Sequence, residues 1–157
     1  MKKRPFFAYL VFILLTEAAG LLSALLSGDG SGFYATVVKP PLSPPGWLFP
    51  VVWTVLYALM GFGAARIWLT GLTRERRRAL LIFGLQLAVN FCWSLFFFNA
   101  RAFGLSFLWL LLLWLLIVLM IAAFRRLDRT AARLQLPYLL CVSFAGYLNY
   151  MIWQLNP

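Results

Sequence analysis

Hydrophobic residues form five long runs along the chain, separated by short segments that are polar or rich in proline. The runs cover approximately residues 6–27, 47–69, 79–99, 103–124 and 134–155. Each reaches the roughly 20 residues that an α-helix needs to cross about 30 Å of bilayer hydrocarbon. Backbone groups in hydrocarbon must bond within their own segment, and the period-two alternation of barrel strands is absent. The pattern predicts an all-α membrane protein, a bundle of five transmembrane helices formed by a single domain, residues 1–157.

Lys and Arg residues are distributed unevenly between the two ends of this predicted bundle. With the N-terminus placed inside, all but Lys39 and Arg101 of the 14 Lys and Arg residues lie on the inner side. Basic residues accumulate in the inner loops of membrane proteins, so we expect the N-terminus inside and the C-terminus outside. The net charge of +10 comes in short runs between apolar segments. This placement argues against nucleic-acid binding and favours contact with anionic membrane lipid.

Scarce residue types limit the chemistry that the chain can perform. Histidine is absent, which excludes histidine catalysis and histidine ligation of a metal or haem iron. No metal site is predicted. Cys92 and Cys141 both lie inside apolar runs, so we expect two buried free thiols, with a disulfide as the alternative.

The first connection, residues 28–46, is the longest and contains Pro40, Pro41, Pro44 and Pro45. Because proline fixes φ and removes a backbone donor, residues 39–46 are predicted to be rigid and extended. The last two prolines lead into the second helix, where proline is tolerated.

The third hydrophobic run has one polar and aromatic face. Its Gln86, Asn90, Trp93 and Phe97 follow the spacing i, i+4, i+7 and i+11, which is a single helical stripe. A carboxamide facing lipid would leave its polar groups unpaired, so this stripe is predicted to face protein or a wet cavity. Gly84 and Ala88 lie about 200° around the helix from Gln86 and Asn90. This small-residue pair predicts a close homodimer contact, with packing inside the bundle as the alternative.

Polar, aromatic or small residues also form stripes on three other runs. Because such groups gain little from lipid, the stripes together predict an internal pocket, aromatic near its outer mouth and capped by the proline-rich segment. The stripes are Trp53, Tyr57, Gly61 and Ala64 on the second run, Tyr138, Cys141, Ala145 and Asn149 on the fifth, and Glu17, Gly20 and Ala24 on the first.

Glu17 is an acidic residue inside the first hydrophobic run. An ionisable residue at membrane depth is a functional candidate, so one hypothesis is ligand contact or proton coupling in a small-molecule transporter. The alternative is a neutral carboxyl, which burial favours, bonded to a neighbouring helix.

Three segments resemble one family of membrane proteins. Residues 33–68, FYATVVKPPLSPPGWLFPVVWTVLYALMGFGAARIW, are similar to a K-P-x-W/F-x-P-P loop followed by V-W-x-x-L-Y-x-x-M-G. Residues 86–98, QLAVNFCWSLFFF, resemble Q-x-x-x-N-x-x-W-x-x-x-F-F, and residues 137–156, PYLLCVSFAGYLNYMIWQLN, resemble P-Y-x-x-W-x-x-F-A-x-x-L-N. On these motifs the chain is identified as a member of the TspO/MBR family, the tryptophan-rich sensory and translocator proteins that include the peripheral benzodiazepine receptor.

The resemblance implies a bacterial-type, five-helix protein, commonly a homodimer, with no covalent cofactor. The helical character and the short basic loops favour the bacterial cell (inner) membrane. Members bind tetrapyrroles such as protoporphyrin IX or other haem-pathway intermediates, and many bind cholesterol or synthetic benzodiazepine-site ligands. Porphyrin binding, transport or sensing is therefore the leading hypothesis. Gly84 and Ala88 match a dimer contact of bacterial members. Carried over by motif position, the ligand-binding residues are Tyr34, Pro44, Phe49, Trp53, Tyr57, Asn90, Trp93, Cys141, Ala145 and Leu148.

Two positions depart from the family pattern. Leu42 stands where the loop usually has an aromatic residue, so the loop is expected to pack more loosely over a ligand. Cys141 stands where the fifth helix usually has Trp. Some members are reported to degrade protoporphyrin in light, a reaction attributed to that Trp and the one matching Trp53. Here Trp53 is the remaining catalytic candidate, so a light- and oxygen-dependent porphyrin-degrading enzyme is a weaker alternative to a binding protein.

Overall fold

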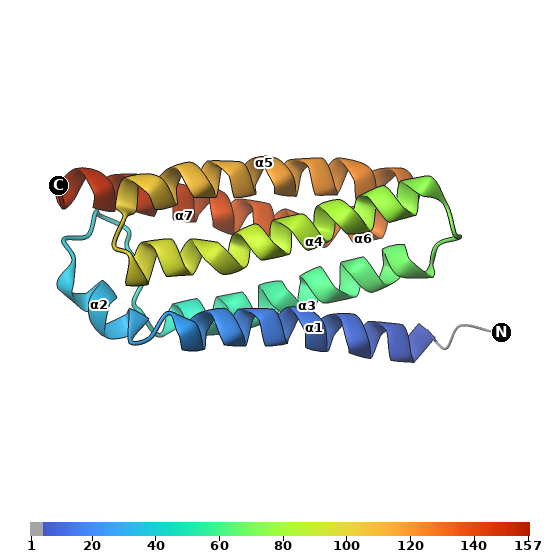
Figure 1. Cartoon of the computed structure of the whole chain (residues 1–157), viewed down its shortest axis with the longest axis horizontal. Helices are drawn as coiled ribbons and strands as arrows, with labels where there is room; N and C mark the ends of the chain where they lie inside the picture. The colour runs from blue at the N-terminus through green and yellow to red at the C-terminus, as the bar shows by residue number, and fades with distance from the viewer. Residues whose placement is uncertain (1–4) are drawn as a thin grey trace.

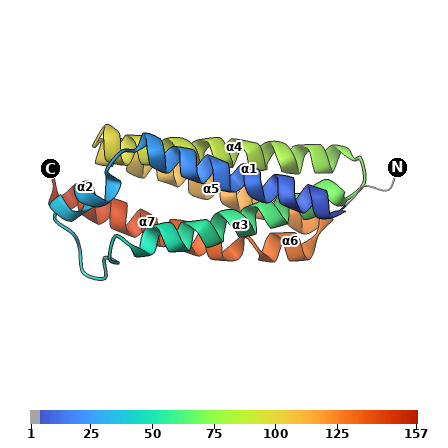
Figure 2. The same cartoon turned by 90° about the horizontal axis from the view of Figure 1, so that it is seen from below.

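The computed structural model describes residues 5–157, which form a bundle of five long helices and two short ones. The long helices run side by side along the longest axis of the molecule (Figures 1 and 2). The start of α1 and the end of α7 lie at opposite ends of the bundle (Figure 1). The elements are α1 (Pro5–Leu26), α2 (Gly30–Thr36), α3 (Leu48–Leu69), α4 (Arg74–Ser94), its π-helical continuation η1 (Leu95–Asn99), α5 (Phe103–Leu127), α6 (Arg129–Arg133) and α7 (Leu136–Leu155).

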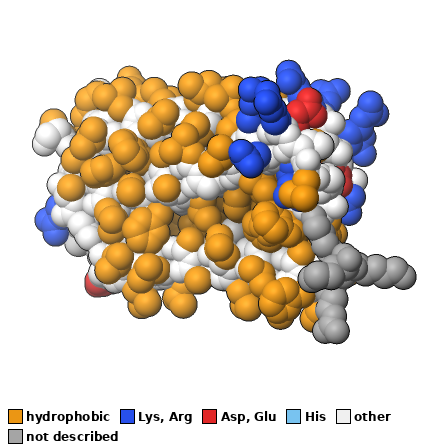
Figure 3. All heavy atoms as spheres, turned by 45° about the vertical axis from the view of Figure 1, so that its right-hand side comes forward, with side chains coloured by type: hydrophobic (Ala, Val, Ile, Leu, Met, Phe, Trp, Pro, Cys, Tyr) orange, Lys and Arg blue, Asp and Glu red, His pale blue; other side chains and the backbone are white. Residues whose placement is uncertain are grey.

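Five segments of residues 5–157 are long and apolar enough to cross a membrane: Pro5–Leu26, Leu48–Leu69, Arg74–Asn99, Phe103–Leu127 and Arg129–Leu155. Large hydrophobic side chains cover the outside of the bundle, and only 11% of the most apolar part of α1 is buried. Lys and Arg side chains gather at one end of the molecule (Figure 3). The predicted five-helix bundle is therefore confirmed, and the protein is an integral, multi-pass membrane protein. Which end faces inside stays a prediction from charge.

Helix α1 packs closely against α3 because a glycine stands at their contact. A Cβ added to Gly61 would lie 2.6 Å from the Cα of Ile13 and 2.7 Å from the carbonyl oxygen of Phe12. Next to this contact, the hydroxyl of Thr16 donates a 2.7 Å hydrogen bond to the carbonyl of Tyr57. The backbones of α1 and α3 can approach this closely only without a side chain at Gly61.

An ion pair joins the basic end of α3 to the turn between α5 and α6. The guanidinium of Arg66 lies 2.8 Å from the carboxylate of Asp128, which also caps α6 by accepting the Ala131 N–H at 2.9 Å. Partial burial alone would raise the pKa of Asp128, but the hydrogen bonds from Ala131 and Arg66 and the charge of Arg66 outweigh it. The pKa of Asp128 is therefore held below its usual value.

Several boundaries differ from those that the hydrophobic runs predict. Helix α4 begins at Arg74 rather than near residue 79, because Thr73 caps it by accepting the Arg76 N–H at 3.1 Å. The first connection contains α2, which the hydrophobic pattern does not predict. Asp29 caps α2 through the Gly32 N–H at 2.9 Å. Residues 39–46 were predicted to be extended, but the segment turns at residues 41–42, where Leu42 has a positive φ of 69° and is exposed.

Candidate ligand cavity

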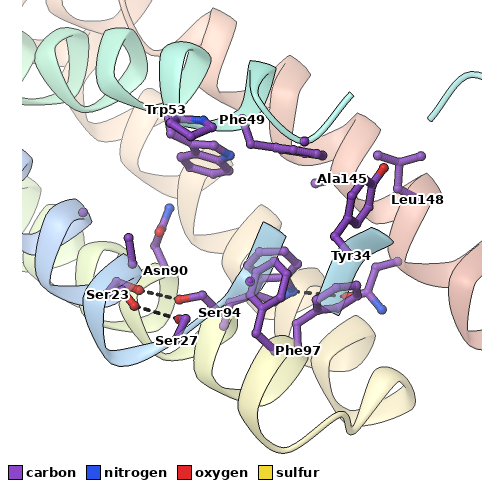
Figure 4. Close-up of a pocket in the computed structure, with 18 of the residues that line it drawn as sticks. Ser23, Ser27, Tyr34, Phe49, Trp53, Asn90, Ser94, Phe97, Ala145 and Leu148 are labelled. Carbon is purple, nitrogen blue, oxygen red and sulfur yellow. Dashed lines mark hydrogen bonds between the residues drawn. The ribbon is translucent and has the colours of Figure 1, made fainter. Parts of the chain in front are cut away.

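A cavity of about 370 Å³ lies at the end of the bundle where α2 is found. It is enclosed by α1, α2, α3, α4, η1 and α7, so segments far apart in the sequence meet around it (Figure 4). Its lining is almost entirely apolar, with a few polar groups, which is the usual character of a small-molecule site. The lining residues are Gly20, Ser23, Ala24, Ser27, Gly28, Gly30, Tyr34, Gly46, Phe49, Pro50, Trp53, Tyr57, Asn90, Trp93, Ser94, Phe97, Phe98, Ala145, Leu148, Asn149 and Ile152.

Aromatic rings form two opposite sides of the cavity. Trp53 and Phe49 lie on one side, and Phe97 lies on the other (Figure 4). Trp53 packs on Tyr57 with the ring centroids 5.7 Å apart, and Trp93 stacks on Phe97 at 5.3 Å. Rings held by their neighbours in this way present fixed flat surfaces to whatever occupies the space between them.

A chain of buried hydrogen bonds forms the inner end of the cavity. The Tyr57 hydroxyl donates to the Asn90 carboxamide oxygen at 2.8 Å, and the Asn90 amide donates to the Tyr138 hydroxyl at 2.6 Å. Tyr138 donates in turn to the Gln86 carboxamide oxygen at 2.8 Å. Gln86 and Phe97 are also buried, so the polar stripe of α4 and η1 faces inward as predicted.

A second polar group consists of serine hydroxyls between α1 and α4. The Ser23 hydroxyl donates to the Phe91 carbonyl at 2.9 Å and hydrogen-bonds with the Ser94 hydroxyl, while Ser27 donates to the Ser23 carbonyl at 2.7 Å (Figure 4). Ser23, Ser27 and Ser94 were not predicted as site residues. For the two on the α1 side, the available signal was spacing: Ser23 follows Gly20 by three residues, and Ser27 follows Ala24 by three.

Eight of the ten residues predicted to bind the ligand lie around this one cavity: Tyr34, Phe49, Trp53, Tyr57, Asn90, Trp93, Ala145 and Leu148. Pro44 is not in the lining, although its carbonyl accepts a 3.3 Å hydrogen bond from the Tyr34 hydroxyl. Burial raises the pKa of Tyr34, which keeps its hydroxyl a neutral donor. Cys141 is a half-buried free thiol on α7 that packs against the bundle core and does not line the cavity.

Three further predicted residues lie outside the cavity. Glu17 is half-buried on α1 and makes no hydrogen bond or ion pair with the residues that the structure describes, so no bonded partner for its carboxyl is found there. Gly84 and Ala88 are exposed on α4. A Cβ added to Gly84 would meet nothing within 4 Å, so packing of this small-residue pair inside the bundle is excluded for residues 5–157.

The fold and the cavity define a class: a five-helix membrane protein with a cavity lined by aromatic rings at one end of the bundle. A model of the TspO/MBR family matches residues 12–154. The tryptophan-rich protein TspO of Chlorobaculum tepidum is 44% identical over 128 residues, covering 81% of each chain. The translocator protein of Ovis aries is 38% identical over 148 residues, covering 92% of this chain and 88% of the relative. The protein CrtK of Rhodobacter capsulatus is 36% identical over 152 residues, covering 95% and 92%. The chain belongs to the TspO/MBR family.

Proposed function

We propose that the protein binds a planar tetrapyrrole, such as protoporphyrin IX, in the cavity beneath α2 and the proline-rich segment. This binding would act in porphyrin transport or sensing. The observation that carries the proposal is the arrangement of Trp53, Tyr57 and Trp93 around a space of about 370 Å³ with an almost wholly apolar lining. Large aromatic faces bind flat conjugated ligands through stacking and apolar burial. Membership in the TspO/MBR family supports the same class of ligand.

We infer that the affinity comes from ring contacts and burial, since the chain has no histidine to ligate a metal at the centre of the ring. The amide of Asn90 is committed to the two tyrosine hydroxyls, and the Trp93 indole N–H donates to the Asn149 carboxamide at 3.1 Å. The hydroxyls of Ser23 and Ser27 also donate within the protein, to the carbonyls of Phe91 and Ser23, so they offer a ligand their oxygens as acceptors. Lys39 instead caps α2, donating to the Tyr34 carbonyl at 2.9 Å.

Tryptophan fluorescence tests this proposal. Titration of the purified protein with protoporphyrin IX in darkness is expected to quench the fluorescence, and the double variant Trp53→Phe/Trp93→Phe is expected to bind at least tenfold more weakly. Trp114→Phe is the matched control, because Trp114 lies on α5 outside the cavity and donates to Ser143 at 2.9 Å. Unchanged affinity in the double variant, measured by porphyrin absorbance, would remove the cavity from consideration as the site.

We also propose that two copies of the chain associate through the exposed face of α4 that carries Gly84 and Ala88. Small residues allow two helix backbones to approach closely in a membrane. Ala88→Leu is expected to convert the dimer to a monomer in detergent, as measured by light scattering coupled to size exclusion. Ala122→Leu, at an exposed position of α5, makes the same change elsewhere. An Ala88→Leu protein that stays dimeric would contradict this interface.

A further inference from the structure

A second hollow lies at the other end of the bundle, between the end of α3 and the start of α4. It measures about 540 Å³ and is lined by Trp68, Leu72, Thr73, Arg74, Arg76, Arg77, Leu80 and Leu81. Lys and Arg side chains gather at this end (Figure 3). The cavity proposed for the porphyrin shares none of these residues.

Arg76 is the buried centre of this hollow, with only 6% of its surface exposed. Its Nη1 donates to the carbonyls of Trp68 at 3.0 Å and Thr70 at 3.2 Å, and its guanidinium carbon lies 4.8 Å from the centre of the Trp68 ring. These three contacts fix the guanidinium in place. Its Nε and Nη2 donors have no hydrogen-bond partner among residues 5–157.

The positive charge of the hollow is not balanced by an ion pair within residues 5–157, although Glu75 lies in the same first turn of α4. The ion pair found among the described residues is Arg66–Asp128, and it lies outside the hollow. No acidic side chain of residues 5–157 forms an ion pair with Arg74, Arg76 or Arg77. A buried cation without a counter-charge is costly, so an anion from outside is the expected partner. The three arginines lie in the first turn of α4, where the helix dipole also favours negative charge.

The apolar surface directly beside the arginines indicates which kind of anion the hollow can bind. Leu72 is 85% exposed and Leu81 is 66% exposed, and both line the same hollow as Arg76. A small hydrated anion gains nothing from these leucines, whereas a molecule with a phosphate head and acyl chains covers both surfaces at once. Basic pockets at the ends of spanning helices are suited to such headgroups.

We propose that this hollow binds an anionic phospholipid, with the phosphate at the free Nε and Nη2 donors of Arg76 and at Arg77, and an acyl chain along Leu81. The planar guanidinium can donate two parallel hydrogen bonds to phosphate oxygens, which a single ammonium group cannot. The site is a place for one bound lipid at the interface, separate from the porphyrin cavity.

Native mass spectrometry of the delipidated protein tests the site with phosphatidylglycerol as the probe. The wild type is expected to retain one phosphatidylglycerol tightly and phosphatidylcholine much more weakly. Arg76→Gln and Arg77→Gln are each expected to weaken phosphatidylglycerol binding about fivefold, the contribution of one basic residue near a membrane surface. Arg129→Gln is the matched control, since it removes one charge from an exposed position at the same end of the bundle and outside the hollow.

Three outcomes would overturn the proposal. An equal loss in Arg129→Gln would mean that the lipid responds to net charge alone. Phosphatidylcholine bound as tightly as phosphatidylglycerol would remove the role of the anion, and inorganic phosphate that displaces the lipid at millimolar concentration would mean a soluble-anion site. Because Arg76 also bonds to the backbone of α3, the Arg77→Gln variant decides the matter if Arg76→Gln fails to fold.

Discussion

The carboxamide of Asn90 on α4 accepts a 2.8 Å hydrogen bond from the hydroxyl of Tyr57 on α3. Asn90 also donates to Tyr138 on α7, so one side chain joins three spanning helices. Tyr57 touches the cavity, whereas Tyr138 is fully buried. These hydrogen bonds therefore attach the wall of the cavity to the bundle core and hold the aromatic rings beside it in place.

The first prediction removes this junction. Asn90→Leu leaves the Tyr57 hydroxyl without its acceptor in a buried position, which costs about 1–3 kcal/mol for an unsatisfied group. We expect a lower free energy of unfolding in detergent and a weaker affinity for protoporphyrin IX. Gln154→Leu, on the exposed surface of α7, is expected to change neither quantity. If Asn90→Leu unfolds like the wild type, the hydrogen-bond chain contributes nothing to stability.

The second prediction concerns the contact between α1 and α3. Gly61→Ala places a methyl group against the backbone of Ile13 and Phe12, and backbone cannot move aside as a side-chain tip can. Such overpacking costs about 1–3 kcal/mol, so the midpoint of thermal unfolding in detergent is expected to fall.

Gly146→Ala on α7 is the control for Gly61→Ala. Its added methyl would meet only the end of the Leu110 side chain, at 3.4 Å. The same exchange in a spanning helix should be neutral or stabilising there, because Ala favours helix more than Gly does. Equal effects of the two variants would mean that the α1–α3 contact is not limited by space.

The hydrophobic pattern was sufficient for the spanning helices because hydrocarbon leaves the backbone no other partner than its own carbonyls. The same reasoning correctly turned Gln86 and Asn90 inward, since an amide has no partner in lipid. The start of α4 was placed too late because its first five residues, 74–78, are charged and precede the apolar run, although Thr73 was a visible capping residue. Helix α2 has seven residues, too few to show a helical period.

The cavity lining was harder to predict than the helices. Which residues of α1 and α7 reach the cavity depends on how each helix is rotated about its axis, and side-chain packing sets that rotation. The α7 stripe correctly included Ala145 and Asn149, but Cys141, one turn earlier, faces the core and not the cavity. Ser23 and Ser27 were missed because serine is common on spanning helices, where it bonds to its own backbone.

The third prediction is a pH dependence from the Arg66–Asp128 ion pair. Because the pKa of Asp128 is lower in the folded protein, the pair stabilises the fold fully above the unfolded pKa of about 3.9. This contribution is lost as the pH falls further, through the folded pKa. Asp128→Asn is therefore expected to cost about 1 kcal/mol at pH 7 for a partly exposed pair.

The difference between wild type and Asp128→Asn should shrink as the pH is lowered from 5 to about 2, followed by unfolding in an acid-stable detergent. Asp29→Asn is the comparison for a carboxylate that caps a helix at the other end of the bundle. A gap that stays constant across this range would contradict a role for the charge of Asp128.

The last prediction concerns two hydrogen bonds between Asn156, at the C-terminal end of α7, and Val38, directly before the proline-rich residues 39–46. The Asn156 carboxamide accepts the Val38 N–H at 3.0 Å and donates to the Val38 carbonyl at 3.0 Å, so it pairs with the segment as a neighbouring strand would. Asn156→Ala removes both bonds and frees the connection between α2 and α3, which borders the cavity through Gly46. A loss of about 1 kcal/mol of stabilisation from these two bonds corresponds to release of bound protoporphyrin IX about fivefold faster. Stopped-flow recovery of tryptophan fluorescence measures this rate, with Gln154→Ala as the control two residues away.

Since Asn156→Ala leaves the aromatic walls untouched, the amplitude of quenching should stay the same as in the wild type. A change of amplitude without a change of rate would mean that Asn156 shapes the cavity rather than its exit.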